Sequence, residues 1–252
     1  MPVTSKSRDG LIKRLSKTHI KKADSKMKKE YTHITLVVDR SNSMFNIKNE
    51  MTAGVNALIA EQFACDDKLT LTLVEFDTII ETVARMSDKP IEYRLLPRLA
   101  TRLFDAVGGE IEQTLKDISA LSETDRPDRV LFVVFTDGFD THSSDYNLKA
   151  LRETIAGCRE SEGWDFQFIG VDESALSGSQ MGINTVRVDR HSVYDILDKL
   201  SMELMKARYD KTYALDLRRR LDLGEITEDE VEIIIREIRA KNEHLRRTRR
   251  TG

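Results

Sequence analysis

The sequence predicts an α/β domain with a doubly wound, mostly parallel central sheet and helices on both faces, followed by a C-terminal helical hairpin. Short apolar segments alternate along the chain with longer amphipathic ones. The apolar segments are nearly continuous, as in strands buried on both faces. The 252 residues, 40% of them hydrophobic, suffice for one sizeable domain with appendages.

Each expected strand is a short run rich in Val, Ile, Leu, Thr or Phe. "HITLVVD" (33–39) ends in an aspartate, and "DRVLFVVFTDG" (128–138), the most apolar run, also reaches an aspartate at its end. "KLTLTLVEFD" (68–77) and "TIIETVARM" (78–86) adjoin with little between them, which favours a hairpin-like pair. The remaining strands are expected at "WDFQFIGVD" (164–172) and "NTVRVD" (184–189).

Each expected helix carries apolar residues on one face at a spacing of three or four. The stretch 101–121 is one such segment, 145–160 is another, and 192–213 closes the domain with a long helix. The first expected helix, 46–64, carries such a stripe. The stripe consists of Ile47, Met51, Val55, Leu58, Ile59 and Phe63.

Charge and patterning divide the chain into a basic extension (1–30), a central domain (31–213) and a helical tail (214–252). The extension carries ten Lys or Arg and three Asp or Glu. Residues 31–217 hold 20 of the 40 basic and 32 of the 43 acidic residues, so the centre is acidic. Basic ends fit solubility, or contact with nucleic acid, an anionic lipid surface or an acidic partner.

Composition favours a cytoplasmic protein without a transmembrane segment. No apolar run approaches the length that spans a bilayer, and the basic N-terminus lacks the apolar core of a secretory signal. Cys65 and Cys158 lack CxxC spacing and give no disulfide framework. These features suit a reducing compartment.

A carboxylate and two hydroxyls follow the first strand in the spacing D-x-S-x-S, as Asp39, Ser41 and Ser43. Ligands of open α/β sheets bind beyond the carboxyl ends of the strands, so Asp39 and Asp137 are expected at the same edge, on neighbouring strands. Oxygens at alternate loop positions can converge on a hard divalent cation. The same serines can instead cap the helix that begins near Asn46, and these three residues leave both interpretations open.

Thr101 adds a hydroxyl on the loop before a helix, and the whole set resembles the von Willebrand factor A (vWA) domain and its metal-ion-dependent adhesion site (MIDAS). The family's pattern is D-x-S-x-S after the first strand, a threonine in a later loop and an aspartate after the fourth strand. The resemblance covers roughly residues 31–210, and "TRLFDAV" and "TDGFD" are similar to bacterial and phage members. Leu99 and Ala100 stand where members often have glycines. The matching positions are Asp39, Ser41, Ser43, Thr101 and Asp137.

The resemblance implies a non-enzymatic protein-interaction module. In the family a divalent cation, here expected to be Mg²⁺ with Mn²⁺ or Ca²⁺ as alternatives, keeps an open coordination position that an Asp or Glu carboxylate of a partner protein fills. Asp140 is a candidate to support the ligands or a turn residue, with the turn favoured, and Asp105 is expected to brace the loop or helix. Similar bacterial and phage proteins include stress-resistance proteins and partners of AAA+ ATPases.

The tail predicts a helix start of its own within "LDLGEITEDEVEIIIREIRAKN". Thr227 and Glu230 form a capping box, Ile226 and Val231 a hydrophobic staple, and Gly224 suits the end of a preceding helix. The stretch also resembles a short helical hairpin thought to mediate oligomerisation in bacterial proteins. Self-association and docking onto the core are therefore both expected roles.

Two rival functions stay open. A Mg²⁺-dependent phosphoester hydrolase is disfavoured because the chain has no D-x-D, no phosphate-binding glycine pattern and no nucleophile elbow around Ser41 or Ser43, although His142 is nearby in sequence. A nucleic-acid-associated protein would use the basic termini. Aromatic residues for base stacking are sparse there, and the acidic centre repels phosphates.

Overall fold

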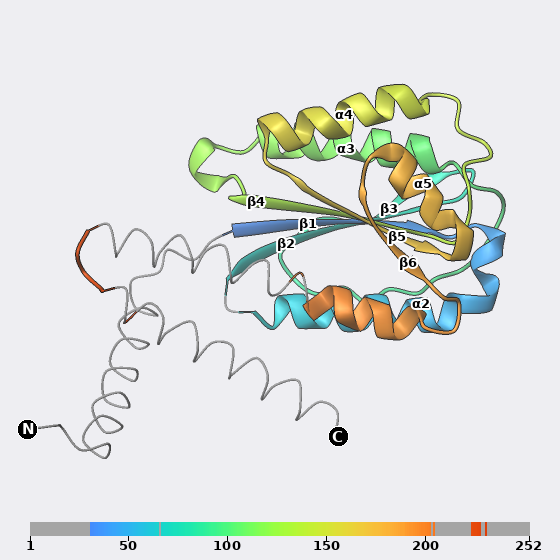
Figure 1. Ribbon diagram of the computed structural model, residues 1–252, viewed down its shortest axis with the longest axis horizontal. Helices are drawn as coiled ribbons and strands as arrows, with labels where there is room; N and C mark the ends of the chain where they lie inside the picture. Colours follow the sequence, from blue (N-terminus) through green and yellow to red (C-terminus); the bar gives the residue numbers. More distant parts are fainter. Residues whose placement is uncertain (1–30, 66, 203, 205–222, 228–229, 231–252) are drawn as a thin grey trace, which may run out of the picture. The chain divides into compact units, whose positions relative to one another are not determined.

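The computed structural model describes residues 31–65, 67–202, 204, 223–227 and 230 (Figure 1). The chain divides into two compact units, and one of them, Lys29–Ala207, holds the α/β domain. The other consists of Met1–Lys28 and Arg208–Gly252. The expected basic extension (1–30) and most of the expected tail (214–252) lie outside the described residues. No described helix is long and apolar enough to cross a membrane.

Six strands form one sheet in the order β3-β2-β1-β4-β5-β6. All neighbouring strands are parallel except β2 and β3, so the predicted mostly parallel sheet and the predicted hairpin-like pair are both confirmed. The strand order reverses between β1 and β4, where open α/β sheets bind ligands. The strands are β1 (Tyr31–Asp39), β2 (Lys68–Phe76), β3 (Ile80–Ser87), β4 (Arg129–Thr136), β5 (Asp165–Val171) and β6 (Asn184–Val188).

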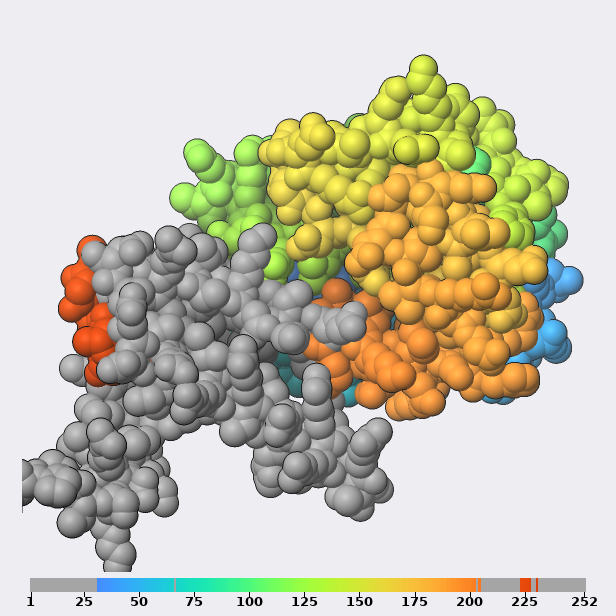
Figure 2. Space-filling view, in the orientation of Figure 1, coloured from blue at the N-terminus to red at the C-terminus, as the bar shows by residue number. Residues whose placement is uncertain are grey.

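Helices cover both faces of the sheet, as the sequence predicts (Figure 1). On one face lie α2 (Lys48–Phe63) and a closing helix that the structure describes over 193–202. On the other lie α3 (Leu103–Ser119), α4 (Leu148–Ser161) and α5 (Ala175–Met181). In the space-filling view α4 is yellow, and α5 and the closing helix are orange (Figure 2). Short 3₁₀ turns occur at η1 (Asn42–Ile47), η2 (Glu123–Asp125) and η3 (Asp172–Ser174).

The central strand β1 is buried along its whole length, which explains its continuous apolar pattern. Ile34, Leu36 and Val38 join the core beneath α2 and the closing helix. Val37 points to the opposite face and joins the core beneath α3 and α4, as the alternation of strand side chains requires. Burying each such side chain contributes about 1.5–3 kcal/mol. Asp39, the last residue of β1, is thus held by a firmly packed strand.

The predicted stripe of the first helix faces the sheet, with five of its six residues buried and Phe63 partly buried. On the same helix, Gly54 allows the closing helix to approach closely. A Cβ atom at Gly54 would lie 2.3 Å from Leu197 Cδ1, so a larger residue would force the two helices apart. The close packing holds the closing helix against α2.

The few described tail residues contain the predicted capping box. Thr227 N donates to Glu230 Oε2 at 2.9 Å, and Glu230 N donates back to Thr227 Oγ1 at 3.3 Å. Gly224 has φ of +67°, the left-handed conformation expected just after a helix end. Val231, the predicted staple partner of Ile226, and the apolar stripe that follows lie outside the described residues.

Candidate metal centre

Two carboxylates lie at the carboxyl edge of the sheet. Asp39 is the last residue of β1, and Asp137 directly follows β4, the neighbouring strand. The prediction that both aspartates end adjacent strands is confirmed. Because the strand order reverses between β1 and β4, the pair occupies the position at which open α/β sheets bind ligands.

The hydroxyls of the D-x-S-x-S segment face the aspartates. Ser43 Oγ donates a hydrogen bond to Asp137 Oδ1 at 2.5 Å, and Ser41 Oγ lies 3.0 Å from Ser43 Oγ. Ser41 stands at the start of η1 without a side-chain hydrogen bond to the turn, and α2 has no side-chain cap at Ile47. The helix-cap interpretation of the two serines is therefore not what the structure shows.

The Thr101 hydroxyl lies near the same aspartates and serines. A Cβ atom built on Gly138 would lie 3.5 Å from Thr101 Oγ1, 3.7 Å from Ser43 Oγ and 3.8 Å from Asp39 Oδ2. Three oxygens from two segments of the chain, the D-x-S-x-S segment and the loop of Thr101, thus surround one point beside Gly138, where the missing side chain leaves space. Together with the hydrogen bonds of Ser41 and Asp137, this brings the five predicted ligand residues to one place.

Among the described residues, the two carboxylates have a single ion pair, from Arg190 to Asp137. Burial raises the pKa of Asp39 to about 6; hydrogen bonds from Thr136 and Ser41 oppose the shift, and the charge of Asp137 adds to it. Burial also raises the pKa of Asp137, against the hydrogen bond from Ser43 and the charge of Arg190. A bound cation favours the ionised form of both groups and offsets the cost of burying them.

One carboxylate oxygen is left without a donor. Among the buried side-chain nitrogen and oxygen atoms of the described residues, only Asp137 Oδ2 has no hydrogen-bond partner. An Arg190 guanidinium nitrogen lies 3.5 Å away, close enough for charge attraction and without a hydrogen bond. A buried acceptor without a donor is costly, so this atom is suited to accept a cation.

The donor set suits a hard cation. Two carboxylates and three hydroxyls offer only oxygen, which Mg²⁺, Mn²⁺ and Ca²⁺ prefer. No group of three or more His, Cys, Asp or Glu side chains able to hold a metal occurs in the described part of the chain. Any metal at this edge would therefore depend on the serine and threonine hydroxyls as well as on the aspartates.

Backbone hydrogen bonds position the loop that carries Thr101. The Thr101 carbonyl accepts from Thr141 N and His142 N, both at 3.0 Å, which ties it to the loop after β4. Asn42 N donates to the Leu99 carbonyl at 3.1 Å, which ties the same loop to η1. Leu99 has φ of +60°, a conformation that favours glycine, at a place where glycines often precede this threonine. The loop adopts this conformation although the residue is a leucine.

No family model matches the sequence, and no curated protein matches it either. Solved structures do match. The von Willebrand factor domain of the type V pili tip protein Mfa5 from Porphyromonas gingivalis aligns with a TM-score of 0.54 at 9% identity, over 71% of this chain and 97% of that one. The chain has the von Willebrand factor A fold. At this identity the likeness concerns the fold alone.

A second structure similar to this vWA fold is proximal thread matrix protein 1 from the mussel byssus, solved with a zinc-occupied MIDAS motif. The TM-score is 0.50 at 15% identity, over 68% of this chain. The match spans 45% of the mussel protein's chain, so the present sequence corresponds to less than half of that protein. The zinc belongs to the mussel protein.

Asp105 and Asp140 hold together two segments of the domain, α3 and the loop after β4. Asp105 accepts hydrogen bonds from the backbone N–H groups of residues 144–146, at 2.8–2.9 Å. Asp140 Oδ1 accepts from Phe104 N, in the first turn of α3, at 3.2 Å and from Ser143 Oγ at 2.5 Å. These bonds fix the start of α3, two residues beyond Thr101. Both aspartates thus act as braces in the described structure.

Thr136 is a functional residue that the sequence interpretation missed. Its hydroxyl donates to Asp39 Oδ2 at 2.5 Å and accepts from Gly138 N at 3.0 Å. It therefore orients Asp39 and the loop that carries Asp137. Its position directly before Asp137 in "FTDG" is the only signal the sequence offers.

Arg40 is the second missed residue, because it fills a variable position of the D-x-S-x-S motif. Its guanidinium is nearly buried and forms ion pairs with Glu75, Asp77 and Glu81, with Nε 2.9 Å from Asp77 Oδ2. Arg98, from the loop before Thr101, also pairs with Asp77, at 2.6 Å. This charged cluster connects the D-x-S-x-S segment and the loop before Thr101 to β2 and β3.

Proposed function

We propose that the domain is a non-catalytic, metal-dependent protein-interaction module. A divalent cation, Mg²⁺ in the first place, is held at the sheet edge and coordinates an Asp or Glu carboxylate of a partner protein. The observation that carries this proposal is the convergence of hydroxyl and carboxylate oxygens around Gly138, with Asp137 Oδ2 left without a donor. The residues that hold the cation are Asp39, Ser41, Ser43, Thr101 and Asp137.

The two aspartates differ in how many of their oxygens already accept hydrogen bonds, so we assign them different roles. Both oxygens of Asp39 already accept hydrogen bonds, from Ser41 N at 2.6 Å and from the Thr136 hydroxyl at 2.5 Å. Asp137 keeps one oxygen without a donor and is therefore the stronger direct ligand. Neutral hydroxyls supply the rest of the set, so the cation stays incompletely neutralised and attracts an external carboxylate.

Binding is better supported than hydrolysis at this site. A serine nucleophile needs a base within hydrogen-bond reach. His142, the histidine nearest in sequence, has its Nδ1 atom 2.8 Å from Thr141 Oγ1, and no hydrogen bond joins it to Ser41 or Ser43 in the described structure. The serines instead hydrogen-bond each other and Asp137, an arrangement suited to hold a cation.

Isothermal titration calorimetry with MgCl₂ and MnCl₂ tests the metal site. Asp39→Ala removes a carboxylate, and Gly138→Ala keeps all five side chains while placing a methyl group among their oxygens. We expect both variants to lose metal binding while their circular dichroism spectra stay unchanged. Asp88→Ala, at an exposed position after β3, is the matched control and binds as the wild type does.

Partner capture is then compared in Mg²⁺ and in EDTA, with wild type and Asp39→Ala in parallel. Capture that needs the metal and is lost in the variant supports the proposal. Capture that is equal in EDTA, or equal for folded Asp39→Ala, would refute the metal-bridged mechanism. Hydrolysis of phosphoester substrates by the wild type, abolished in Asp39→Ala, would refute the non-catalytic assignment.

A further inference from the structure

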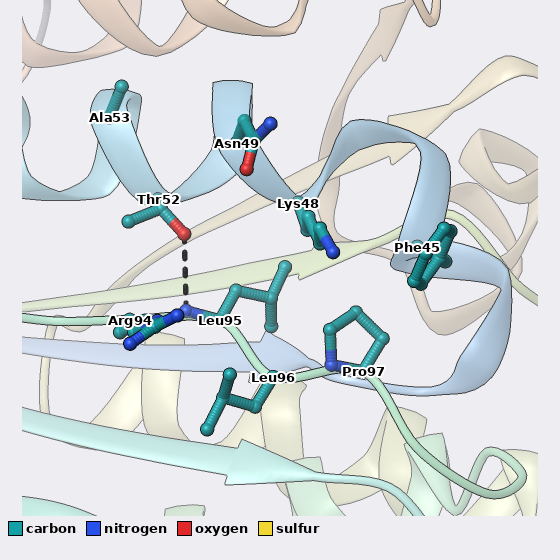
Figure 3. Close-up of a pocket in the computed structure, with 9 residues that line it drawn as sticks. All are labelled: Phe45, Lys48, Asn49, Thr52, Ala53, Arg94, Leu95, Leu96 and Pro97. Atoms are coloured by element: carbon teal, nitrogen blue, oxygen red, sulfur yellow. Dashed lines mark hydrogen bonds between the residues drawn. The ribbon is translucent and has the colours of Figure 1, made fainter.

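A groove of about 400 Å³ lies beside the candidate metal centre, between the start of α2 and the segment 94–97 (Figure 3). Phe45 and Lys48 line it from η1 and α2, and Arg94, Leu96 and Pro97 line it from the segment opposite. The volume falls at the small end of the range for ligand pockets, about 300–1,000 Å³. It has room for a few side chains of a bound peptide.

The groove and the metal centre are built from the same two segments of the chain. Phe45 is two residues beyond Ser43, and Pro97 is four residues before Thr101. The two segments are joined by backbone hydrogen bonds from Arg98 N to the Arg40 carbonyl at 2.8 Å and from Asn42 N to the Leu99 carbonyl at 3.1 Å. These bonds hold the two segments together between the candidate metal ligands and the residues that line the groove.

The groove is held open by its own contacts. Thr52 Oγ1 accepts a hydrogen bond from Leu95 N at 3.1 Å, which fixes the segment 94–97 against α2 (Figure 3). Lys48 Nζ lies 4.1 Å from the centroid of the Phe45 ring, a cation–π contact that holds both side chains in place. Both walls are thus ordered before any ligand arrives.

The chemistry of the walls is apolar and positive. Phe45 and Leu96 are 57% and 60% exposed, so the groove offers large apolar side chains to a ligand. Lys48 and Arg94 make no ion pair with any described residue, whereas Arg40 and Arg98 on the adjoining loops are both paired. Both cations therefore supply positive charge to the groove in a domain whose central part is acidic.

We propose that this groove binds a second acidic residue of the same partner segment whose first carboxylate goes to the metal. An apolar residue of that segment packs on Phe45 and Leu96, and the second carboxylate pairs with Lys48 and Arg94. The inference rests on the proposed function and makes it more specific. The partner motif contains two acidic residues separated by at least one apolar residue.

The test uses fluorescein-labelled synthetic peptides and fluorescence polarisation on the full chain in MgCl₂. One peptide series carries a single Asp in a Gly-Ser background. A second adds Leu and a Glu at spacings of two to six residues from the Asp, and a third has Lys in place of that Glu. The proteins are the wild type, the double variant Lys48→Glu/Arg94→Glu and a control variant, Lys116→Glu. Lys116 is an exposed residue of α3.

For the best spacing we expect the wild type to bind the two-acid peptide about tenfold more tightly than the one-acid peptide, a difference of about 1.4 kcal/mol. Lys116→Glu keeps this preference. The double variant loses it, retains Mg²⁺-dependent binding of the one-acid peptide, and gains preference for the peptide with Lys. Binding of the Lys-containing peptide by the double variant shows that the variant is folded. It also shows that the groove contacts the peptide, because only the charges have been exchanged.

Other outcomes separate this inference from the proposed function. Mg²⁺-dependent binding that is equal for one-acid and two-acid peptides overturns the groove assignment and leaves the metal module intact. Absence of Mg²⁺-dependent binding in every series overturns both. A lower oligomeric mass of the double variant without peptide, measured by sedimentation, would assign the groove to a second copy of the chain and also overturn the inference.

Discussion

The Ser43 hydroxyl donates a 2.5 Å hydrogen bond to Asp137 Oδ1 across 94 positions of the sequence. This bond joins the loop after β1 to the loop after β4 at the reversal of strand order. Both residues are proposed metal ligands, so the same two side chains link the loops with or without a cation. Metal binding and loop stability should therefore be coupled.

Mg²⁺ is expected to stabilise the folded domain, and Ser43→Ala to reduce that effect. A ligand that binds only the folded state at 100 times its dissociation constant adds about 2.7 kcal/mol. Urea denaturation with MgCl₂ and with EDTA measures the gain. Ser122→Ala is the control, because Ser122 Oγ also donates to an aspartate, Asp125, at 2.6 Å in the loop before β4. Equal Mg²⁺ stabilisation in both variants would contradict the assignment of Ser43.

Thr136→Val is expected to weaken Mg²⁺ or Mn²⁺ binding by about 10–100-fold, the usual effect of removing a group that orients a ligand. The change keeps the shape of the side chain and removes the hydroxyl that donates to Asp39 Oδ2. Thr136→Ser keeps the hydroxyl and should bind nearly as the wild type does. Calorimetric titration measures the three affinities. Tight binding by Thr136→Val would show that Asp39 needs no such support.

The placement of the carboxylates could be predicted from the sequence because parallel strands end at one edge of a sheet. The apolar runs that stop at Asp39 and Asp137 carry that information locally. The roles of Thr136 and Arg40 could not be predicted in the same way. Arg40 pairs with Glu75, Asp77 and Glu81, which are 35 to 41 positions away, and these pairs depend on the register of β1, β2 and β3.

At Leu99 the sequence departs from the vWA pattern, which often has glycine there. The loop before Thr101 nevertheless adopts the left-handed conformation that glycine favours. Leu99→Gly should leave stability unchanged or raise the free energy of unfolding by up to about 1.5 kcal/mol. Glycine removes about 1–2 kcal/mol of left-handed strain, and the unfolded chain regains about 0.4–1 kcal/mol of entropy. Leu99 is 58% exposed, so little packing is lost.

The matched control for Leu99 is Leu96→Gly, three residues earlier. Leu96 is 60% exposed and does not have positive φ, so glycine relieves no strain there and should cost about 0.4–1 kcal/mol. Urea denaturation of both variants measures the difference. Equal losses at the two positions would contradict the left-handed conformation of Leu99.

His33 should make the domain less stable as pH falls from about 6.5 to about 4. The side chain is fully buried in β1, with Nδ1 2.8 Å from Thr70 Oγ1 and Nε2 3.1 Å from Thr35 Oγ1. Burial lowers its pKa to about 4, with the Arg85 charge acting in the same direction and the Asp117 charge opposing. In the unfolded chain the pKa returns to about 6.5.

Between these two pKa values the unfolded state binds a proton that the folded state does not, so protonation favours unfolding. The full difference of roughly 2.5 pH units corresponds to about 3 kcal/mol. His33→Gln keeps a polar side chain without a titratable group. Urea denaturation at pH 7, 6, 5 and 4 should show the wild type losing about 3 kcal/mol relative to the variant, because other titrating groups, Asp39 included, are common to both. Parallel pH profiles for the two proteins would show that folding does not lower the pKa of His33.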